Sequence, residues 1–472
     1  MIDDLRRSGS RVRMVFLDAR TDVLIRRYES TRRRHPASSG DLLGAAIEQE
    51  RQALEPMRAD ADVVVTSTAV KKDNPEVVAA QARKIPVIPR ALMLAELMRF
   101  RDGIAIAGTH GKTTTTALTA CLLDASGMQP GFLIGGQPVN FPHSARLGEE
   151  GAPFVIEGDE YDTAFFDKRA KFFHYLPEIA VVTSLEFDHA DIYPDLEAII
   201  RAFRLMLRQI PREGRLIVCA DDPNALALRE HAYCPVESYG FDASADWRGE
   251  LAPFSGMPGG CVGLRVHRSG ALWGDVTVPM AGRHNLRNAL AAIAACAALG
   301  MSAADIAHAM PGFQGVKRRM EVFLEARGIT FVDDFAHHPT AIRETIAAAR
   351  QRWPRRKLHV LFEPRSNTVV TNRFQAEMNA AFREADAVWL MPNPYWKEEP
   401  GPRKTTRIDE FEIVSRPLTP DEMRARFRQF RSAVATQHQP AAAPVPLSDV
   451  PVSVDGQLGD GEWADASRVP IV

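Results

Sequence analysis

Cysteine and lysine are scarce in this sequence of 472 residues. The five cysteines are odd in number, far apart and without a C-x-x-C pair; they are Cys121, Cys219, Cys234, Cys261 and Cys296. This pattern excludes a disulfide framework and a cysteine zinc site, and it is typical of reduced thiols in a cytosolic protein. Only ten residues are lysine, so arginine provides most of the 58 basic side chains. Because 60 acidic residues balance them, the net charge of −2 argues against nucleic-acid binding through bulk charge.

Long apolar runs are also missing. No run approaches the roughly 18–20 apolar residues that cross a bilayer, and the first residues, MIDDLRRSGSRVRMVF, contain no apolar core of a signal peptide. We therefore expect a cytoplasmic protein without a membrane partner. Hydrophobic residues make up 45% of the chain, which excludes a wholly disordered protein, and the length allows about three domains.

Strands alternate with helices along most of the chain, which predicts an α/β fold with a doubly wound parallel sheet. Two early strands, Val12–Leu17 and Ala61–Thr68, can pair in parallel, with a helix expected at 41–57 between them. From Pro75 the expected elements are helix 75–83, strand 85–88, helix 91–99, strand 103–107 and helix 112–126, followed by strands 153–157 and 179–183. Residues 243–281 favour antiparallel strands, and helix 285–299 is rich in alanine.

A second α/β rhythm begins near residues 315–320. Its strands are expected at 329–333, 358–362 and 386–391, and its helices at 340–352 and 373–384. After about residue 397 the order decays, and residues 434–447 are rich in Ala, Pro and Gln, as linkers are.

A glycine turn between strand 103–107 and helix 112–126 predicts a phosphate-binding loop. Its residues are Gly108, Thr109, His110, Gly111, Lys112, Thr113 and Thr114. Glycines let backbone N–H groups approach an anionic oxygen at the start of a helix. Lys112 can reach the terminal phosphates, and the Thr113 hydroxyl can bind Mg²⁺. The alternative is a plain glycine turn with a surface lysine.

Two further residues are candidate Mg²⁺ ligands because each follows a predicted strand end. Glu157 ends strand 153–157, and His189 lies shortly after strand 179–183. Carboxyl ends of parallel strands meet at one edge of a sheet, where the predicted phosphate loop also lies. The alternative is a solvated acidic loop and a structural histidine.

Five segments, in this order, resemble the Mur ligase family, the ATP-dependent enzymes of peptidoglycan synthesis. They are GTHGKTTTT (108–116), EGDEYD (157–162), EFDHADIYPD (186–195), GRHNLRNALAA (282–292) and DDFAHHPTAIRET (333–345). Two other segments, EYDTAFFDKRAKFFHY (160–175) and EPRSNT (363–368), resemble the branch that joins UDP-N-acetylmuramate to the murein tripeptide L-alanyl-γ-D-glutamyl-meso-diaminopimelate. The resemblance thus implies a ligase of cell-wall biogenesis, and with it a part in cell shape, cell division and the cell cycle.

The resemblance also implies roles for single residues. Lys112 would hold the β/γ-phosphates, Thr113 and Glu157 one Mg²⁺, and His189 a second. The nucleotide side would be formed by His284, Asn285 and Asn288, for which a helix N-terminus with capping asparagines is the alternative.

The part of the resemblance after residue 315 implies ATP closure and acceptor binding. Arg319 and Asp334 match the residues by which the family's third domain closes over ATP. His337 and His338 would then face the phosphate, although tandem histidines can also be structural. Arg365, with Ser366 and Asn367, is suited to binding an acceptor carboxylate. The chain has no lysine between Lys171 and Lys317, so the carbamylated lysine of several family members is absent.

The resemblance divides the chain into four parts. We expect an incomplete N-terminal α/β segment at 1–100, a central ATP-binding domain with a P-loop-type parallel sheet at 101–314, a truncated Rossmann-like C-terminal domain at 315–396, and an irregular tail at 397–472. The family's glycine-rich UDP-sugar domain has no counterpart in residues 1–65; residues 12–65 instead resemble a fragment of the bacterial nucleotide-binding RNase-adaptor family. Position 184 is Ser where the Mur family usually has Asn.

Two other functions fit parts of the sequence. An ATP-binding pseudo-enzyme would follow if the UDP-sugar site is missing. A nucleotide- or RNA-binding regulator would use the arginines within residues 26–35, although such a cluster is more often a solvated surface.

Overall fold

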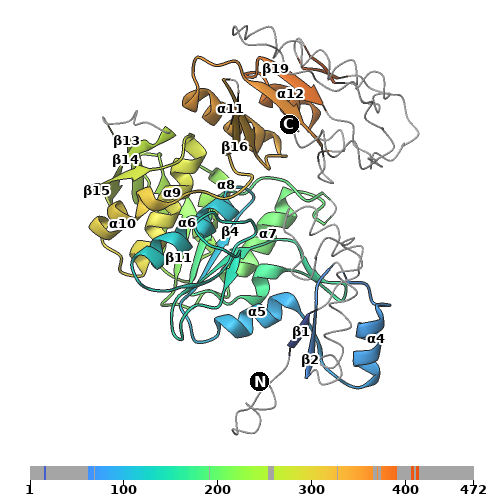
Figure 1. Ribbon diagram of the computed structural model, residues 1–472. Coiled ribbons are helices and arrows are strands. Elements are labelled where there is room, and N and C mark those ends of the chain that lie inside the picture. The colour runs from blue at the N-terminus through green and yellow to red at the C-terminus, as the bar shows by residue number, and fades with distance from the viewer. Residues whose placement is uncertain are drawn as a thin grey trace. The chain divides into compact units, whose positions relative to one another are not determined.

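The computed structural model describes residues 15–17, 62–68, 70–190, 192–252, 260–326, 328–364, 369, 374–390, 406–408 and 411–413 (Figure 1). The chain divides into two compact units. The first contains Met1–Pro279 and Leu286–Gln314, and the second Met280–Asn285 and Gly315–Val472. The helix expected at 41–57, the arginine cluster within 26–35 and residues Arg365, Ser366 and Asn367 lie outside the described residues.

A small parallel sheet is formed by the first three strands of unit 1. Strand β1 (Val15–Leu17) pairs with β2 (Val63–Thr66), and β2 pairs with β3 (Val87–Pro89). The predicted parallel pairing of the two early strands is therefore confirmed. Helix α4 (Pro75–Ala82) connects β2 to β3, and the Asn74 side chain caps it by accepting from the N–H groups of Glu76 and Val77. Helix α5 (Arg90–Met98) follows β3 directly.

The main sheet of unit 1 has ten strands, and most of them are parallel. The strands are β4 (Gly103–Ala107), β5 (Gly131–Leu133), β6 (Ala145–Arg146), β7 (Phe154–Gly158), β10 (Ile179–Val182), β11 (Arg215–Cys219), β12 (Val236–Gly240), β13 (Trp247–Leu251), β14 (Val262–Arg268) and β15 (Ala271–Val278). Their order is β15-β14-β13-β12-β11-β10-β4-β7-β5-β6. Strands β14 and β15 are antiparallel to their neighbours, as the pattern of residues 243–281 predicts, whereas β13 is parallel to β12.

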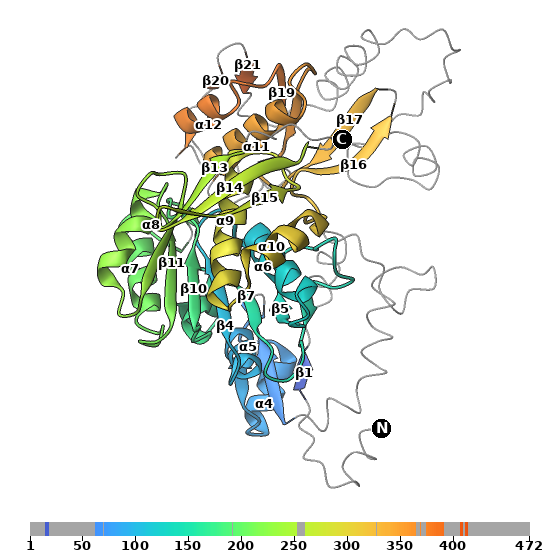
Figure 2. The same cartoon turned by 90° about the vertical axis from the view of Figure 1, so that its left-hand side faces the viewer.

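The connections that follow β4 and β10 run toward opposite edges of the main sheet. From β4 it runs through α6 (Lys112–Ala125) to β5, and from β10 through α7 (Leu196–Leu207) to β11. Figure 2 shows α6 with α9 (Arg283–Ala298) and α10 (Ala303–Ala309) on one face, and α7 with α8 (Pro223–Ala227) on the other. The switch point between β4 and β10 is where ligands bind in open α/β sheets. The loop after β4 lies at this point.

The core of unit 1 lies between the main sheet and helices α6 and α9. Strand β4 is buried on both faces, as in parallel sheets covered by helices. Helix α9 buries every residue from Ala289 to Cys296, and these are mainly alanines, which allow close packing. The Cys296 thiol reaches the Thr119 carbonyl of α6, with 3.9 Å between sulfur and oxygen.

Unit 2 contains short strand pairs with helices. Strand β16 (Glu321–Ala326) is antiparallel to β17 (Ile329–Asp333), and β18 (His359–Phe362) is parallel to β19 (Ala387–Leu390). Helices α11 (Pro339–Arg352) and α12 (Gln375–Ala381) pack around a core that includes Ile342, Ile346, Phe362, Met378 and Phe382. Two further strands, β20 (Thr406–Ile408) and β21 (Phe411–Ile413), lie where an irregular tail is expected.

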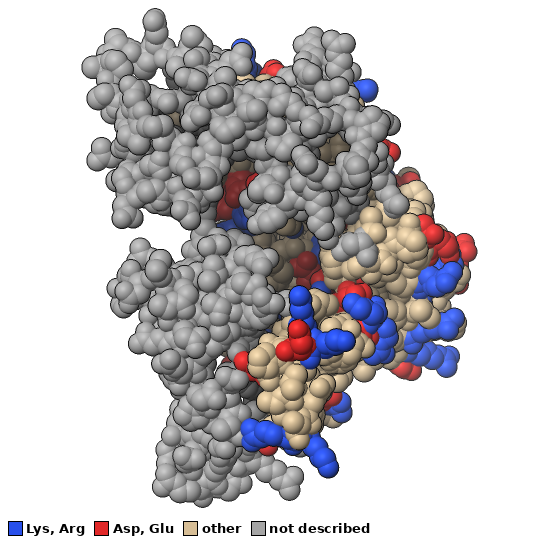
Figure 3. Space-filling model, turned by 90° about the vertical axis from the view of Figure 1, so that its right-hand side faces the viewer, with Lys and Arg blue, Asp and Glu red and all other residues tan. Residues whose placement is uncertain are grey.

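Within the described residues, no helix is long and apolar enough to cross a membrane. On the face shown in Figure 3, acidic and basic side chains of the described residues are interspersed.

Candidate active site

The loop after β4 has two glycines whose conformations only glycine adopts without strain. Gly108 has a φ of 126° and Gly111, which precedes α6, has a φ of 82°. A Cβ on Gly108 would lie 2.3 Å from Thr183 Oγ1, and one on Gly111 would lie 2.3 Å from Asn288 Oδ1. The loop therefore packs closely against the segment that follows β10 and against α9, and it leads into a helix start where backbone N–H groups favour an anion.

The segment after β10 fixes the middle of this loop. Thr109 N–H donates to the Ser184 carbonyl at 2.8 Å, and His110 N–H donates to Ser184 Oγ at 3.0 Å. Thr183 Oγ1 donates to the His110 carbonyl at 2.5 Å, and the His110 ring lies 3.3 Å from a Glu186 carboxylate oxygen. Ser184, the departure from the family's usual Asn, thus serves here to hold the loop.

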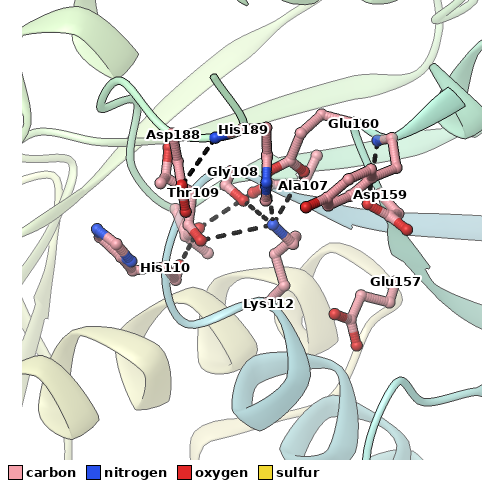
Figure 4. A network of polar contacts seen from close by, with 12 residues as sticks. Ala107, Gly108, Thr109, His110, Lys112, Glu157, Asp159, Glu160, Asp188 and His189 are labelled. Carbon is pink, nitrogen blue, oxygen red and sulfur yellow. Dashed lines mark hydrogen bonds and ion pairs between the residues drawn. The ribbon is translucent and has the colours of Figure 1, made fainter. Parts of the chain in front are cut away.

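Lys112 opens α6, and its ammonium turns back toward the loop. Nζ donates to the Gly108 carbonyl at 2.5 Å and lies 2.9 Å from each Glu160 carboxylate oxygen. Burial alone would lower the pKa of Lys112, but the carboxylates of Glu160, Asp159 and Glu157 outweigh it and leave the pKa raised. Lys112 is therefore a fixed positive charge at the helix start (Figure 4).

Thr113 and Glu157 bring two oxygen ligands together. Thr113 Oγ1 donates to Glu157 Oε1 at 3.1 Å, and the other oxygen of Glu157 accepts from Gly135 N–H at 2.8 Å. Glu157 is the fourth residue of β7, beside β4, so both side chains lie at the edge that carries the loop. A hydroxyl and a carboxylate are hard donors that fit Mg²⁺.

His189 reaches the same network from the segment after β10. Its Nε2 lies 3.0 Å from Glu160 Oε1, and its ring lies 4.1 Å from the Tyr161 ring between centroids. Burial lowers the pKa of His189, but the hydrogen bond and charge of Glu160 outweigh burial and raise it. The backbone of His189 has a φ of 56°, which is uncommon for a residue with a side chain.

Glu160 is the site residue that sequence reasoning missed. Its side chain is only 3% exposed and contacts both Lys112 and His189. The signal was present, because Glu160 is the second glutamate of the EGDEYD segment. Spacing alone did not show which of its acidic residues turns toward the lysine, since this depends on the path of the loop after β7.

The nucleotide-side candidates fall in both units. Asn288 belongs to unit 1 and lies against Gly111, whereas His284 and Asn285 belong to unit 2. The Asn285 side chain donates to the Ala281 carbonyl at 2.7 Å, and His284 Nδ1 lies 3.7 Å from a Glu344 oxygen. The contact of Asn285 is a local one, to the carbonyl four residues earlier, and it is not a capping contact, in which the side chain would accept from helix N–H groups.

Three candidates in unit 2 gather around Phe335. Asp334 accepts from the N–H groups of Met320 and Ala336, each at 2.8 Å. The Arg319 guanidinium lies 5.5 Å from the Phe335 ring, and the His337 ring lies 5.3 Å from it.

The histidine that follows His337 has a structural contact. His338 precedes α11, and its Nδ1 accepts from Thr340 N–H at 3.3 Å. This contact agrees with the structural alternative for the tandem histidines.

Three family models match this chain. The Mur ligase middle domain matches residues 106–296, and the Mur ligase glutamate ligase domain matches residues 318–443. The second match continues beyond residue 395, where the resemblance found in the sequence ended. A RapZ-like N-terminal domain matches residues 2–80, which confirms a second, foreign family at the start of the chain.

Curated relatives carry the name UDP-N-acetylmuramate–L-alanine ligase. The protein from Desulfotalea psychrophila is 38% identical over 417 residues, which are 88% of this chain and 84% of the relative. The one from Roseiflexus sp. is 41% identical over 348 residues, covering 70% of this chain and 72% of the relative.

Solved structures of another branch are also similar. The UDP-N-acetylmuramate:L-alanyl-γ-D-glutamyl-meso-diaminopimelate ligase from Neisseria meningitides is 33% identical, with a TM-score of 0.53, covering 66% of this chain and 94% of that one. A murein peptide ligase from Psychrobacter arcticus is 32% identical, with a TM-score of 0.57, covering 83% and 81%. Together with the geometry of the loop at 108–113, these similarities show that the chain belongs to the Mur ligase family of ATP-dependent ligases that build peptidoglycan precursors.

Proposed function

We propose that this chain uses Mg²⁺ and ATP to join UDP-N-acetylmuramate to L-alanyl-γ-D-glutamyl-meso-diaminopimelate. Residues 101–314 would form the ATP-binding domain and residues 315–396 a truncated C-terminal domain. The observation that supports ATP binding is the start of α6 after Gly111. There Lys112 contacts the Glu160 carboxylate and Thr113 contacts the Glu157 carboxylate.

The donor groups at this edge fit Mg²⁺. Thr113 Oγ1 and Glu157 would hold one ion, and His189 would contribute to a second. Bound Mg²⁺ neutralises phosphate charge and orients the transferred group. Lys112 would add its own charge beside the phosphates, and the α6 N-terminus its backbone N–H groups.

The chemistry would proceed in two displacements. A carboxylate oxygen of the sugar's lactyl group attacks the γ-phosphorus, ADP leaves, and an acyl phosphate forms. The peptide amine then attacks the acyl carbon, phosphate leaves, and the nitrogen loses a proton. Catalysis of this kind depends on charge neutralisation and positioning. His284, Asn285 and Asn288 would contact the nucleotide, and Arg319, Asp334 and His337 would act on the phosphate side.

The tripeptide is supported as acceptor by the hairpin that follows Glu160. Strands β8 (Asp162–Ala164) and β9 (Asp167–Ala170) pair in antiparallel fashion within the EYDTAFFDKRAKFFHY segment. Its side chains Lys168 and Arg169 are 71% and 65% exposed. Each pairs with a carboxylate of the hairpin, Lys168 with Asp162 and Arg169 with Asp167. An acceptor with several carboxylates, unlike a single alanine, would compete for both exposed cations. Arg365, Ser366 and Asn367 remain predicted acceptor contacts.

L-Alanine is the second candidate acceptor, because the curated relatives described above are named for it. The two candidates differ in one measurable quantity. We expect ATP-dependent phosphate release with UDP-N-acetylmuramate and the tripeptide to exceed release with L-alanine at equal concentration, with the product mass showing which acceptor was joined. Faster ligation of L-alanine would contradict the tripeptide assignment. Lys112→Ala provides the inactive control for background phosphate.

A further inference from the structure

Glu160 is a buried carboxylate that contacts two candidate ATP-site residues from different parts of the chain. We propose that Glu160 is a positioning residue, which holds the Lys112 ammonium and the His189 imidazole in the arrangement that receives Mg·ATP. This inference rests on the proposed use of Mg·ATP by the chain, and it does not depend on which acceptor is joined.

Glu160 makes contacts through both its side chain and its backbone. Its two carboxylate oxygens lie 2.9 Å from Lys112 Nζ, and one of them also lies 3.0 Å from His189 Nε2. Its backbone carbonyl accepts from the Tyr193 hydroxyl at 2.8 Å. The side chain is 3% exposed, and the side chains of Lys112 and His189 are 12% and 13% exposed. Tyr193 therefore anchors the backbone of Glu160. The carboxylate joins Lys112 and His189 (Figure 4).

The neighbouring acidic residues Glu157 and Asp159 have other partners, so the contacts of Glu160 with Lys112 and His189 are its own. Asp159 pairs with Lys171 at 2.5 Å, and Glu157 accepts from Thr113 and from the Gly135 N–H. The three carboxylates thus have separate partners: Asp159 pairs with Lys171, Glu157 pairs with Thr113, and Glu160 bridges Lys112 and His189.

A bridge of this kind limits the movement of both groups that it joins. A lysine side chain has four rotatable carbon–carbon bonds and loses considerable freedom when it is held. His189 itself has a left-handed backbone conformation, and its ring is fixed by Glu160 and by the Tyr161 ring. Carboxylates that orient metal-binding histidines typically alter metal affinity or activity by about 10- to 100-fold when they are mutated.

The test measures Mg·ATP binding without sugar or peptide. Glu160→Gln keeps the shape of the side chain but removes its charge, and we expect it to weaken Mg·ATP binding in titration calorimetry by about 10-fold or more, by analogy with such supporting carboxylates. The Mg²⁺ concentration that gives half-maximal ATP binding should rise in parallel. The matched control is Glu250→Gln, on β13, whose carboxylate pairs with Arg248 and is 45% exposed; it should bind as the parent chain does.

A double-mutant cycle separates positioning from general stabilisation. If Glu160 acts through His189, the effect of Glu160→Gln should become several-fold smaller when His189 is already alanine, because contacting residues are not additive. Equal effects in both backgrounds, or unchanged affinity, would overturn the proposal. If Glu160→Gln does not fold, Glu160→Asp takes its place in the same cycle, with the same two outcomes. Failure of this cycle leaves the acceptor assignment standing, since no acceptor is present.

Discussion

Three acidic residues within four positions show how one short segment distributes different contacts. Glu157 is still within β7 and accepts from α6, whereas Asp159 and Glu160 lie in the turn that follows. Lys171 holds Asp159 and lowers the pKa of that carboxyl, although burial by itself would raise it. Lys112 and His189 hold Glu160. Successive side chains of a strand point to opposite faces of the sheet, and β7 ends at Gly158. The side-chain direction of Glu157 therefore follows from its place in the strand, whereas the directions of Asp159 and Glu160 do not.

Replacing Lys112 tests the central residue of the site. Lys112→Ala should weaken Mg·ATP binding by about 10- to 100-fold, since a hydrogen bond to a charged group contributes about 1.5–3 kcal/mol. The variant should also melt at a lower temperature, because it leaves the buried Glu160 carboxylate with one partner fewer. Calorimetry with Mg·ATP and a thermal melt measure the two effects. Lys357→Ala, at an exposed position of unit 2, is the control, and unchanged affinity in Lys112→Ala would contradict the assignment of the phosphate loop.

At the scale of the element, helix α6 offers a comparison between its two ends. Gly111 before the helix and Gly127 after it have φ values of 82° and 83°, but only Gly111 has a close neighbour, Asn288. Alanine at either position should destabilise the fold by about 1–2 kcal/mol through the left-handed backbone. Gly111→Ala should lose more, and it should also lose Mg·ATP binding, because its Cβ overlaps the Asn288 side chain. Denaturant unfolding and calorimetry on both variants measure this, and equal behaviour of the two would contradict a tightly packed loop.

Elements with a strong apolar or glycine pattern could be predicted, whereas short strands in local hairpins could not. The sequence predicts β4, α6 and β7 to within one or two residues, because glycine, apolar runs and helix starts are local signals. The β8–β9 hairpin is not predicted, since its strands are three and four residues long and charged residues occupy much of β9. Strand β16 is also missed, because its pairing with β17 across a short turn requires a partner that periodicity does not identify.

Prediction of the site follows the same division. Loop residues 108–113 and Glu157 follow from strand–turn–helix chemistry, and the structure places them at one sheet edge. Glu160 depends on where a turn folds back, and Asn288 on how α9 packs against Gly111, so neither contact can be read from spacing. The roles of Arg319, Asp334 and His337 remain predictions; the structure shows only that these residues share the neighbourhood of Phe335.

At the scale of the whole chain, two families contribute to one polypeptide. The Mur ligase middle domain match begins at residue 106, two residues before the phosphate loop, so the loop, Glu157, Glu160 and His189 all lie inside it. Residues 2–80 match a RapZ-like domain instead. In the Mur family the UDP-sugar is bound by the domain that precedes the middle domain, according to the resemblance found in the sequence. We therefore expect the ATP site of this chain to bind its ligand as in the Mur family, and the sugar site to differ from the family's.

This difference predicts a specific binding profile. Recognition of a UDP-sugar pyrophosphate requires a glycine turn that follows a strand and opens a helix. In residues 1–65, Gly9, Gly40 and Gly44 are single glycines that form no such turn motif. The chain enters α4 after β2 through Asn74, which is not a glycine. We therefore expect Mg·ATP to bind as in other Mur ligases, but UDP-N-acetylmuramate to bind at least about 10-fold more weakly, equivalent to about 1.4 kcal/mol. Titration calorimetry of both ligands, with the Psychrobacter arcticus murein peptide ligase as the reference, measures the two affinities side by side. Equal sugar-nucleotide affinity in the two proteins would mean that residues 1–100 form a complete sugar site by a different route.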